Sequence, residues 1–314
     1  MKQELLDYLR CPRCAADSVP LGVSVVERRD GEVLAGHLTC PAGHAFPIDQ
    51  GVPDFVEPAG GAVSDVYNIM WAAQARQVYV GREDEFRHKF QVFAHLPGPL
   101  EMYFSDKVVL DAGCGEGRFT WLASHLGARQ VVAVDYSREA LARAKAGTGN
   151  PPNCSFVRAD IMRLPFRRVF DYVISLGVLH HTPSTAAAYR SVVRHLKPAG
   201  YVTIFVYGRW TLPLVIWPLR CLTLKMDSSR VLRFCDDWGF GYESAHRRRL
   251  PLGRFLRTLG RLDVLGMGRV TFEGLTTPYL REHSVDEVHR WFRETGVELI
   301  SCTRLVSASG RRSG

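Results

Sequence analysis

The spacing of apolar residues changes along the 314-residue chain and predicts different elements in different segments. After a linker of small residues, PAGGAVSD (58–65), apolar side chains recur at helical spacing, which predicts two helices within 59–105. From residue 107 onward, short apolar runs alternate with helical stretches. This alternation is typical of a parallel, doubly wound sheet, so we predict an α/β domain over 106–314.

The turn after the first strand of this domain carries a signal for ligand binding. The strand Val108–Leu110 is followed by DAGCGEGRFT, with a helix beginning near Arg118. The glycines follow G-x-G-x-G spacing, unlike the G-x-G-x-x-G of dinucleotide sites, and glycine lets backbone approach a ligand closely. Asp111 before them would repel a pyrophosphate but suits a cationic ligand, directly or through water.

Two later strands also end in carboxylates. Asp135 closes the strand in QVVAVDYS, and its two oxygens can accept hydrogen bonds from both hydroxyls of a ribose. Asp160 ends the next unit, CSFVRADIMRLPF, where it can accept from an adenine amino group. Tyr136 and Ile161 are placed to pack against the adenine ring. The pattern predicts a nucleoside site at the carboxyl edge of the sheet.

These segments resemble the class I S-adenosylmethionine-dependent methyltransferases, specifically the group related to ubiquinone and menaquinone biosynthesis enzymes. The matching segments are DAGCGEGRFT, VDYS, ADIMRLPF, SLGVLHHTP and HLKPAGYV. The resemblance implies a Rossmann-like, doubly wound, mostly parallel seven-stranded sheet with a reversed last strand, which GVELISCTRLVSASGRR would complete. The implied S-adenosylmethionine-binding residues are Asp111, Gly113, Cys114, Gly115, Gly117, Asp135, Tyr136, Asp160, Ile161 and Leu176.

The first 58 residues contain two pairs of metal-ligand side chains. Cys11-x2-Cys14 and Cys40-x3-His44 each sit beside Pro or Gly, as a tight turn requires. Three thiolates and one imidazole complete the closed tetrahedral shell of a structural Zn²⁺ site. His37 is a competing fourth ligand, and unrelated buried cysteines are the alternative to a metal site.

The segment around these ligands also resembles known zinc ribbons. Asp30-Gly31 predicts a hairpin between the two ligand pairs. LLDYLRCPRC…LTCPAGHAFPIDQGVPDFV resembles the zinc-ribbon domain of the Trm112-like family, in which an aliphatic helix precedes the first pair. Its histidine ligand resembles instead the N-terminal ribbon of bacterial ribosomal-RNA guanine-N1 methyltransferases. We therefore expect residues 1–58 to fold largely through metal binding.

An insert of about 75 residues, 207–282, separates the fifth predicted strand from the helix SVDEVHRWFRETG. Its aromatic and Leu-rich stretches, 210–224 and 250–262, predict helices that form a lid over an apolar acceptor pocket. The candidate pocket residues are Tyr67, Trp71 and Tyr207.

Several side chains near the lid are candidates for catalysis. His180 and His181 follow the fourth strand at the carboxyl edge, where one could act as the base that a hydroxyl or carbon acceptor needs. Similar methyltransferases often bring a tyrosine and a histidine to the site at the lid's return, here Tyr279 and His283. The alternative to a catalytic role is that His180 and His181 only line the pocket and that His283 lies at the surface. The strand end SLGVLHH lacks the Asn/Asp-Pro-Pro-aromatic sequence with which relatives bind exocyclic nitrogens.

The net charge of +8 raises the question of a nucleic-acid partner. The excess lies in 203–314, with 18 Lys and Arg against 11 Asp and Glu, whereas residues 1–60 have 5 against 9. An RNA-contacting ribbon would need a basic surface. We therefore favour a small-molecule or lipid-like acceptor, such as a secondary metabolite or envelope precursor, over a ribosomal or transfer RNA recognised by the ribbon. A scaffolding role is a third hypothesis, and the sequence does not indicate an oligomeric state.

The N-terminal sequence MKQELLDYLR shows no secretion signal. The most apolar window, 212–224, has 13 residues and contains two prolines and Arg220, so it is too short to span a bilayer. We expect a cytoplasmic protein without a membrane span, in which the eight cysteines are thiols or metal ligands.

Overall fold

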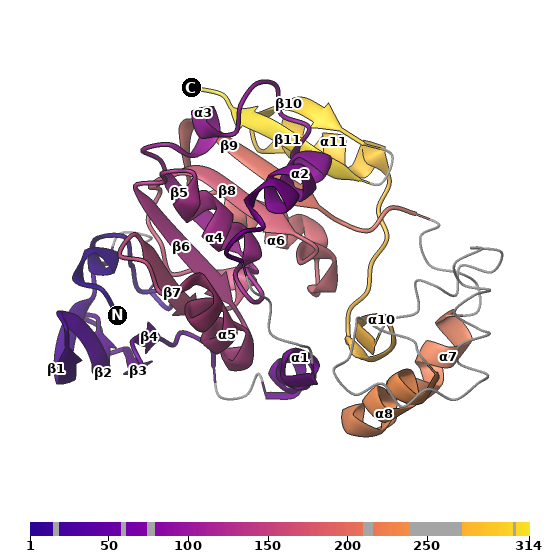
Figure 1. The fold of residues 1–314 in the computed structure, drawn as a ribbon, viewed down its shortest axis with the longest axis horizontal. Helices are drawn as coiled ribbons and strands as arrows, with labels where there is room; N and C mark the ends of the chain where they lie inside the picture. The colour runs from indigo at the N-terminus through magenta and orange to yellow at the C-terminus, as the bar shows by residue number, and fades with distance from the viewer. Residues whose placement is uncertain (15–18, 58–60, 74–78, 210–215, 239–271, 304–305) are drawn as a thin grey trace.

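The computed structural model describes the whole chain except residues 15–18, 58–60, 74–78, 210–215, 239–271 and 304–305 (Figure 1). The described residues form a four-stranded antiparallel sheet, ordered β1-β2-β3-β4, and a seven-stranded sheet, ordered β10-β11-β9-β8-β5-β6-β7. None of the helices in these ranges is long and apolar enough to cross a membrane.

The small sheet is the N-terminal unit. Asp30 and Gly31 both have positive φ, 49° and 80°, as the two-residue turn of the predicted hairpin requires. The helix expected before the first cysteine pair is instead one short 3-10 helix, because the chain extends at Leu9 to bridge Phe166 of the large domain. The elements are η1 (Gln3–Asp7), β1 (Gly22–Arg29), β2 (Glu32–Thr39), β3 (Ala45–Asp49) and β4 (Val52–Pro53).

The large sheet confirms the predicted α/β fold with a seven-stranded, mostly parallel sheet. Five strands run parallel, while β11 lies antiparallel between β9 and β10, which is the expected reversed strand. β9 begins at Leu196 and so includes Lys197–Gly200, where Lys-Pro-Ala-Gly is a sequence typical of a turn before the strand. The strands are β5 (Val108–Ala112), β6 (Gln130–Asp135), β7 (Cys154–Arg158), β8 (Phe170–Leu176), β9 (Leu196–Phe205), β10 (Val297–Cys302) and β11 (Ser307–Arg312).

Helices cover both faces of this sheet because alternate strand residues point to opposite sides. Val109 packs in one core with α2, α4 and α5, and Val108 packs in another with α6 and α11. Helix α11 begins after the N-cap Ser284, which forms a capping box with Glu287. The helices are α2 (Glu83–Ala94), α3 (Glu101–Phe104), α4 (Arg118–His125), α5 (Arg138–Thr148), η3 (Ile161–Arg163), η4 (Leu179–His181), α6 (Thr185–Val193) and α11 (Val285–Glu294).

The remaining helices are set apart from the sheet (Figure 1). Met70 of α1 (Gly61–Ala73) packs with Val231 of α8 (Ser228–Trp238) and Leu275 of α10 (Phe272–Thr276) in a third core. Helix α7 (Ile216–Thr223) lies within the predicted 210–224, whereas 250–262 lies outside the described residues. The apolar pattern missed α8, since its residues in this core are few: Val231, Leu232 and Cys235.

The N-terminal sheet does not have a core of its own. Leu9, Leu38 and Phe46 belong to the same buried cluster as Phe166 and Phe170 of the large domain. The unit predicted as a separate ribbon is therefore packed onto the sheet face that α6 and α11 also cover.

This shared core makes a prediction about Leu9, which is fully buried and bridges to Phe166. Leu9→Ala should lower the free energy of unfolding by about 2–5 kcal/mol, because the cavity lies where both units meet. In denaturant titrations the whole chain should unfold at lower concentration in one transition. The control is Val26→Ala, at a 75% exposed position of β1. Early unfolding of the N-terminal unit alone would contradict a shared core.

Candidate functional site

The glycine loop after β5 is fixed by the neighbouring strand and by close contacts. The backbone N–H groups of Gly113 and Cys114 both donate to Val134 O, at 2.8 and 2.9 Å. A Cβ on Gly113 would lie 2.3 Å from the Val178 side chain, and one on Gly115 would lie 2.8 Å from the Trp71 ring. Both glycines therefore let protein side chains pack directly against the loop backbone.

Gly117 has a different role from the one predicted. It is not among the residues that line the cavity described in the next paragraph. It is the N-cap of α4 and has a φ of 90°. A Cβ there would lie 2.9 Å from Ala144 Cβ, so this glycine allows α4 to approach α5. The sequence alone does not distinguish a glycine that allows two helices to pack closely from a glycine that faces a ligand.

A cavity of about 520 Å³ opens at the carboxyl edge of the parallel strands. This volume lies within the range of small-molecule sites, roughly 300–1,000 Å³. Nine of the ten predicted cofactor residues line it: Asp111, Gly113, Cys114, Gly115, Asp135, Tyr136, Asp160, Ile161 and Leu176. So do all three predicted pocket residues, Tyr67, Trp71 and Tyr207.

Asp135 at the end of β6 is held by backbone groups on both oxygens. Its Oδ2 accepts from Gly115 N at 2.8 Å and its Oδ1 accepts from Ser137 N at 2.9 Å. Each oxygen retains a lone pair for a ligand hydroxyl. Burial raises the pKa of Asp135, and the backbone hydrogen bonds oppose that rise.

Asp111 at the end of β5 is also buried, with one side-chain donor. Its Oδ2 accepts from Thr120 Oγ1 at 2.6 Å. Burial raises the pKa of Asp111 to about 7, an effect that the Thr120 hydrogen bond opposes and the Asp135 charge increases. A cationic group in the cavity would favour the ionised form.

The loop after β7 supplies the remaining predicted contacts to a nucleoside. Asp160 caps the short helix η3, and its Oδ1 accepts from Met162 N at 2.8 Å. The following Ile161 is part of the cavity wall. On the neighbouring loop, Tyr136 O accepts from Arg158 Nε at 3.0 Å. A side chain at the end of β7 therefore connects the loops that follow β6 and β7.

The two histidines after β8 differ in position. His181 lines the cavity, with Nδ1 3.1 Å from Tyr279 O and Nε2 2.8 Å from Glu273 Oε1. A carbonyl oxygen only accepts, so Nδ1 is the donor in the contact with Tyr279, while Nε2 faces the Glu273 carboxylate at ion-pair distance. Tyr279 also lines the cavity.

Two predicted catalytic histidines do not line the cavity. His180 is fully buried, its ring stacks on Tyr207 at 3.9 Å between centroids, and burial lowers its pKa. His283 lies 2.8 Å from Thr185 Oγ1 through Nε2 and packs edge-on against Trp291, and burial lowers its pKa. Both rings are enclosed by protein, so neither can meet an acceptor in this arrangement.

The sequence did not indicate two features of the cavity. Glu273 lines the cavity but belongs to no recognisable sequence motif. Its functional interest comes only from its contact with His181, which lies 92 positions earlier in the chain. Phe93, Phe119 and Phe205 form an aromatic wall, with Phe93 5.0 Å from Phe205 and 6.4 Å from Phe119 between ring centroids. Helical spacing identified Phe93 only as an apolar position.

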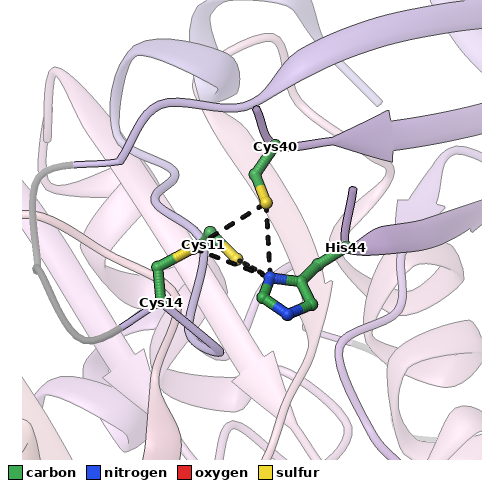
Figure 2. A group of neighbouring side chains, drawn as sticks. All are labelled: Cys11, Cys14, Cys40 and His44. Atoms are coloured by element: carbon green, nitrogen blue, oxygen red, sulfur yellow. Dashed lines mark hydrogen bonds between the residues drawn. The ribbon is translucent and has the colours of Figure 1, made fainter. Parts of the chain in front are cut away.

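The predicted metal ligands converge in the N-terminal unit (Figure 2). The ligand atoms of Cys11, Cys14, Cys40 and His44 all lie within 4.8 Å of one another. Cys14 Sγ lies 3.8 Å from Cys40 Sγ, and His44 Nδ1 lies 3.3 Å from Cys40 Sγ. Sulfur ligands about 2.3 Å from a central ion are about 3.8 Å apart in a tetrahedron, so this donor set fits Zn²⁺. His37 is exposed on β2, outside the cluster.

Comparison with known proteins agrees with the fold. The reversed strand and the glycine loop are typical of a Rossmann-like fold, and Asp135 and Asp160 line the cavity at the carboxyl edge of its sheet. Residues 110–204 match the family described as "Methyltransferase domain". The matched segment, under a third of the chain, contains the glycine loop, Asp135, Asp160 and the two histidines after β8, so this part of the chain is similar to S-adenosylmethionine-dependent methyltransferases.

Three curated relatives have aligned segments of moderate identity. A putative methyltransferase of Encephalitozoon cuniculi is 34% identical over 114 residues, 35% of this chain and 50% of the relative. The tRNA U34 carboxymethyltransferase of Tolumonas auensis is 39% identical over 82 residues, 25% of each chain. The sterol 24-C-methyltransferase of Pneumocystis carinii is 27% identical over 147 residues, which are 44% of this chain and 38% of the relative. This chain thus spans half or less of the length of each.

The raised pKa of Asp111 predicts a pH-dependent affinity for S-adenosylmethionine. Below pH 7 the buried carboxyl holds a proton, which a cationic ligand must displace. Affinity should therefore rise with pH up to about 7, by at most about tenfold per pH unit, and then level off. Titration calorimetry at pH 5.5–8, in two buffers of different ionisation enthalpy, measures both the affinity and the proton release. Asp111→Asn should reduce the slope, and a flat wild-type profile would contradict the assignment.

Proposed function

We propose that this protein transfers a methyl group from S-adenosylmethionine to a small-molecule or lipid-like acceptor. The observation that carries the proposal is one cavity whose lining combines two kinds of residue. Asp135 and Asp160 suit a nucleoside, while Glu273, His181 and the aromatic wall suit an apolar acceptor that loses a proton. A donor and an acceptor can therefore lie side by side in one site, which is what direct transfer requires.

The apolar wall supports an acceptor with an apolar body. Phe93, Phe119, Phe205 and Tyr207 come from three different parts of the fold and line the same cavity. Aromatic faces of this kind favour flat or hydrocarbon ligands. The relatives bear the names of a sterol methyltransferase and of tRNA-modifying enzymes. Residues 1–60 contain more acidic than basic residues, which favours a sterol-like acceptor over RNA.

Glu273 and His181 provide a place for the proton that a hydroxyl or carbon acceptor loses. Bound S-adenosylmethionine would supply a methyl group on a positively charged sulfur, which keeps the bonding electron pair when the carbon–sulfur bond breaks. His181 Nδ1 faces the carbonyl oxygen of Tyr279, and His181 Nε2 lies 2.8 Å from Glu273 Oε1, so the imidazole and the carboxylate lie together at the cavity wall. Glu273 Oε2 makes no hydrogen bond to any described residue and can take the acceptor's proton. His181 then holds Glu273 in place through Oε1.

The test is methyl transfer from labelled S-adenosylmethionine to extracted lipids and small metabolites. The wild-type protein should bind S-adenosylhomocysteine and label an apolar product. Glu273→Gln keeps the shape but cannot accept a proton, so it should lower the rate about 10²–10⁴-fold with unchanged cofactor affinity. Glu294→Gln is the matched control, because the side chain of Glu294 is 49% exposed on α11 and does not line the cavity.

Two results would overturn the proposal. Absence of cofactor binding in calorimetry would exclude any methyltransferase activity. Label appearing in ribosomal or transfer RNA, and not in the small-molecule fraction, would replace the acceptor proposed here with RNA.

We also propose that Cys11, Cys14, Cys40 and His44 hold one structural Zn²⁺. Four protein ligands leave no open position for a substrate, which supports a structural role over a catalytic one. The relationship to Trm112-like ribbons, the ubiquinone and menaquinone subgroup, and a cytoplasmic location all stay predictions from the sequence.

Elemental analysis of the purified protein should find about one zinc per chain. Cys14→Ser should lower the zinc content well below one and lower the unfolding temperature of the whole chain, because the ribbon shares its core with the catalytic domain. Cys221→Ser is the matched control, since that thiol is exposed on α7. Wild-type protein with far less than one zinc per chain would refute the metal site.

A further inference from the structure

The loop that follows β7 is held at both ends by the N-terminal unit. This loop carries Asp160 and Ile161, which line the part of the cavity suited to a nucleoside. It begins after Arg158, the last residue of β7, and ends at Pro165. Backbone hydrogen bonds from the first 57 residues of the chain reach both of these positions.

The first attachment is at Arg158. Phe55 N donates to Arg158 O at 2.8 Å, and Asp54 forms a parallel bridge with the same residue, which places β4 beside β7 (Figure 1). Asp54 Oδ2 accepts from Arg158 Nη1 at 2.8 Å. The two side chains are only 6% and 11% exposed, so water screens this pair weakly.

The second attachment is at the far end of the loop. Arg10 N donates to Pro165 O at 2.8 Å, and Arg167 N donates to Tyr8 O at 3.0 Å. Between these bonds, the buried side chains of Leu9 and Phe166 meet at a bridge.

Arg158 extends this restraint to the neighbouring loop. The same guanidinium that pairs with Asp54 donates through Nε to Tyr136 O at 3.0 Å. Tyr136 follows Asp135, and both line the cavity. The planar fork of arginine can hold two acceptors at fixed positions, so Asp54 sets where Arg158 holds Tyr136.

We propose that Asp54 is a positioning residue for the nucleoside half of the cofactor, acting through Arg158 on the loops after β6 and β7. The proposal rests on the function proposed above, in that S-adenosylmethionine binds at this edge. A loop held in its binding conformation loses less freedom when a ligand binds, and affinity rises accordingly. The N-terminal unit thus contributes to cofactor affinity without touching the cofactor.

The experiment compares two ligands on the metal-loaded full chain by titration calorimetry. S-adenosylhomocysteine contains nucleoside and amino-acid parts, whereas 5′-deoxy-5′-methylthioadenosine lacks the amino-acid tail. Asp54→Asn keeps the size of the side chain but removes its charge, and it should raise the Kd of both ligands by the same factor, about tenfold. Arg158→Lys cannot reach Asp54 and Tyr136 O together and should have the same effect.

Controls separate positioning from general damage to the ribbon. Arg13→Ala removes an ion pair with Glu57 within the N-terminal segment, on a partly exposed surface, and should leave both Kd values unchanged. Asp54→Glu restores the charge and should recover much of the lost affinity. Equal zinc content and circular dichroism among the variants would show that each is folded.

Three results would overturn the inference. Wild-type affinity in folded Asp54→Asn and Arg158→Lys would show that the loops do not depend on this contact. Loss of affinity for S-adenosylhomocysteine alone would place the effect at the amino-acid part of the site. If the wild-type protein binds neither ligand, the proposed function fails and the inference fails with it, a result distinct from the other two.

Discussion

Parallel pairing of β5 with β6 and β8, and of β6 with β7, is the constraint on which the site depends. It brings the ends of all four strands to one edge, so that Asp111, Asp135 and the loop with Asp160 surround the same space. Gly113 and Gly115 then let Val178 and Trp71 pack against the loop at the wall of that space. Because the strands are buried on both faces, this arrangement is maintained by two hydrophobic cores.

Residues whose position follows from local geometry could be placed from the sequence. Asp135 and Asp160 each follow directly from a strand end, and the four metal ligands follow from spacings of two and three residues within chelating turns. The sheet, including its reversed strand, followed from apolar runs together with the family resemblance. Each of these inferences needs only a short stretch of chain, where backbone geometry fixes the relation between neighbours.

The remaining features depend on contacts between distant segments. His180 and His181 are adjacent on one 3-10 helix, but Tyr207 covers the first ring and Glu273 approaches the second. Gly117 has the same spacing as its neighbours, and only the approach of α5 shows its different role. The division at residue 58 followed a change in composition, whereas the hydrophobic core crosses it through Leu9 and Phe166. Composition reports where a chain is polar, not which apolar surfaces meet.

The cavity is bounded by two structures with separate cores. The sheet and its helices form the floor, and α1 with the insert helices α8 and α10 forms the ceiling through a third core that includes Met70 and Leu275. Substitutions inside the ceiling can therefore reshape the acceptor side of the cavity without disturbing the cores beneath the glycine loop. In a chain built this way, mutations in the third core would change which ligands the cavity admits more readily than they would unfold the sheet, because most buried residues of the two structures pack in different clusters.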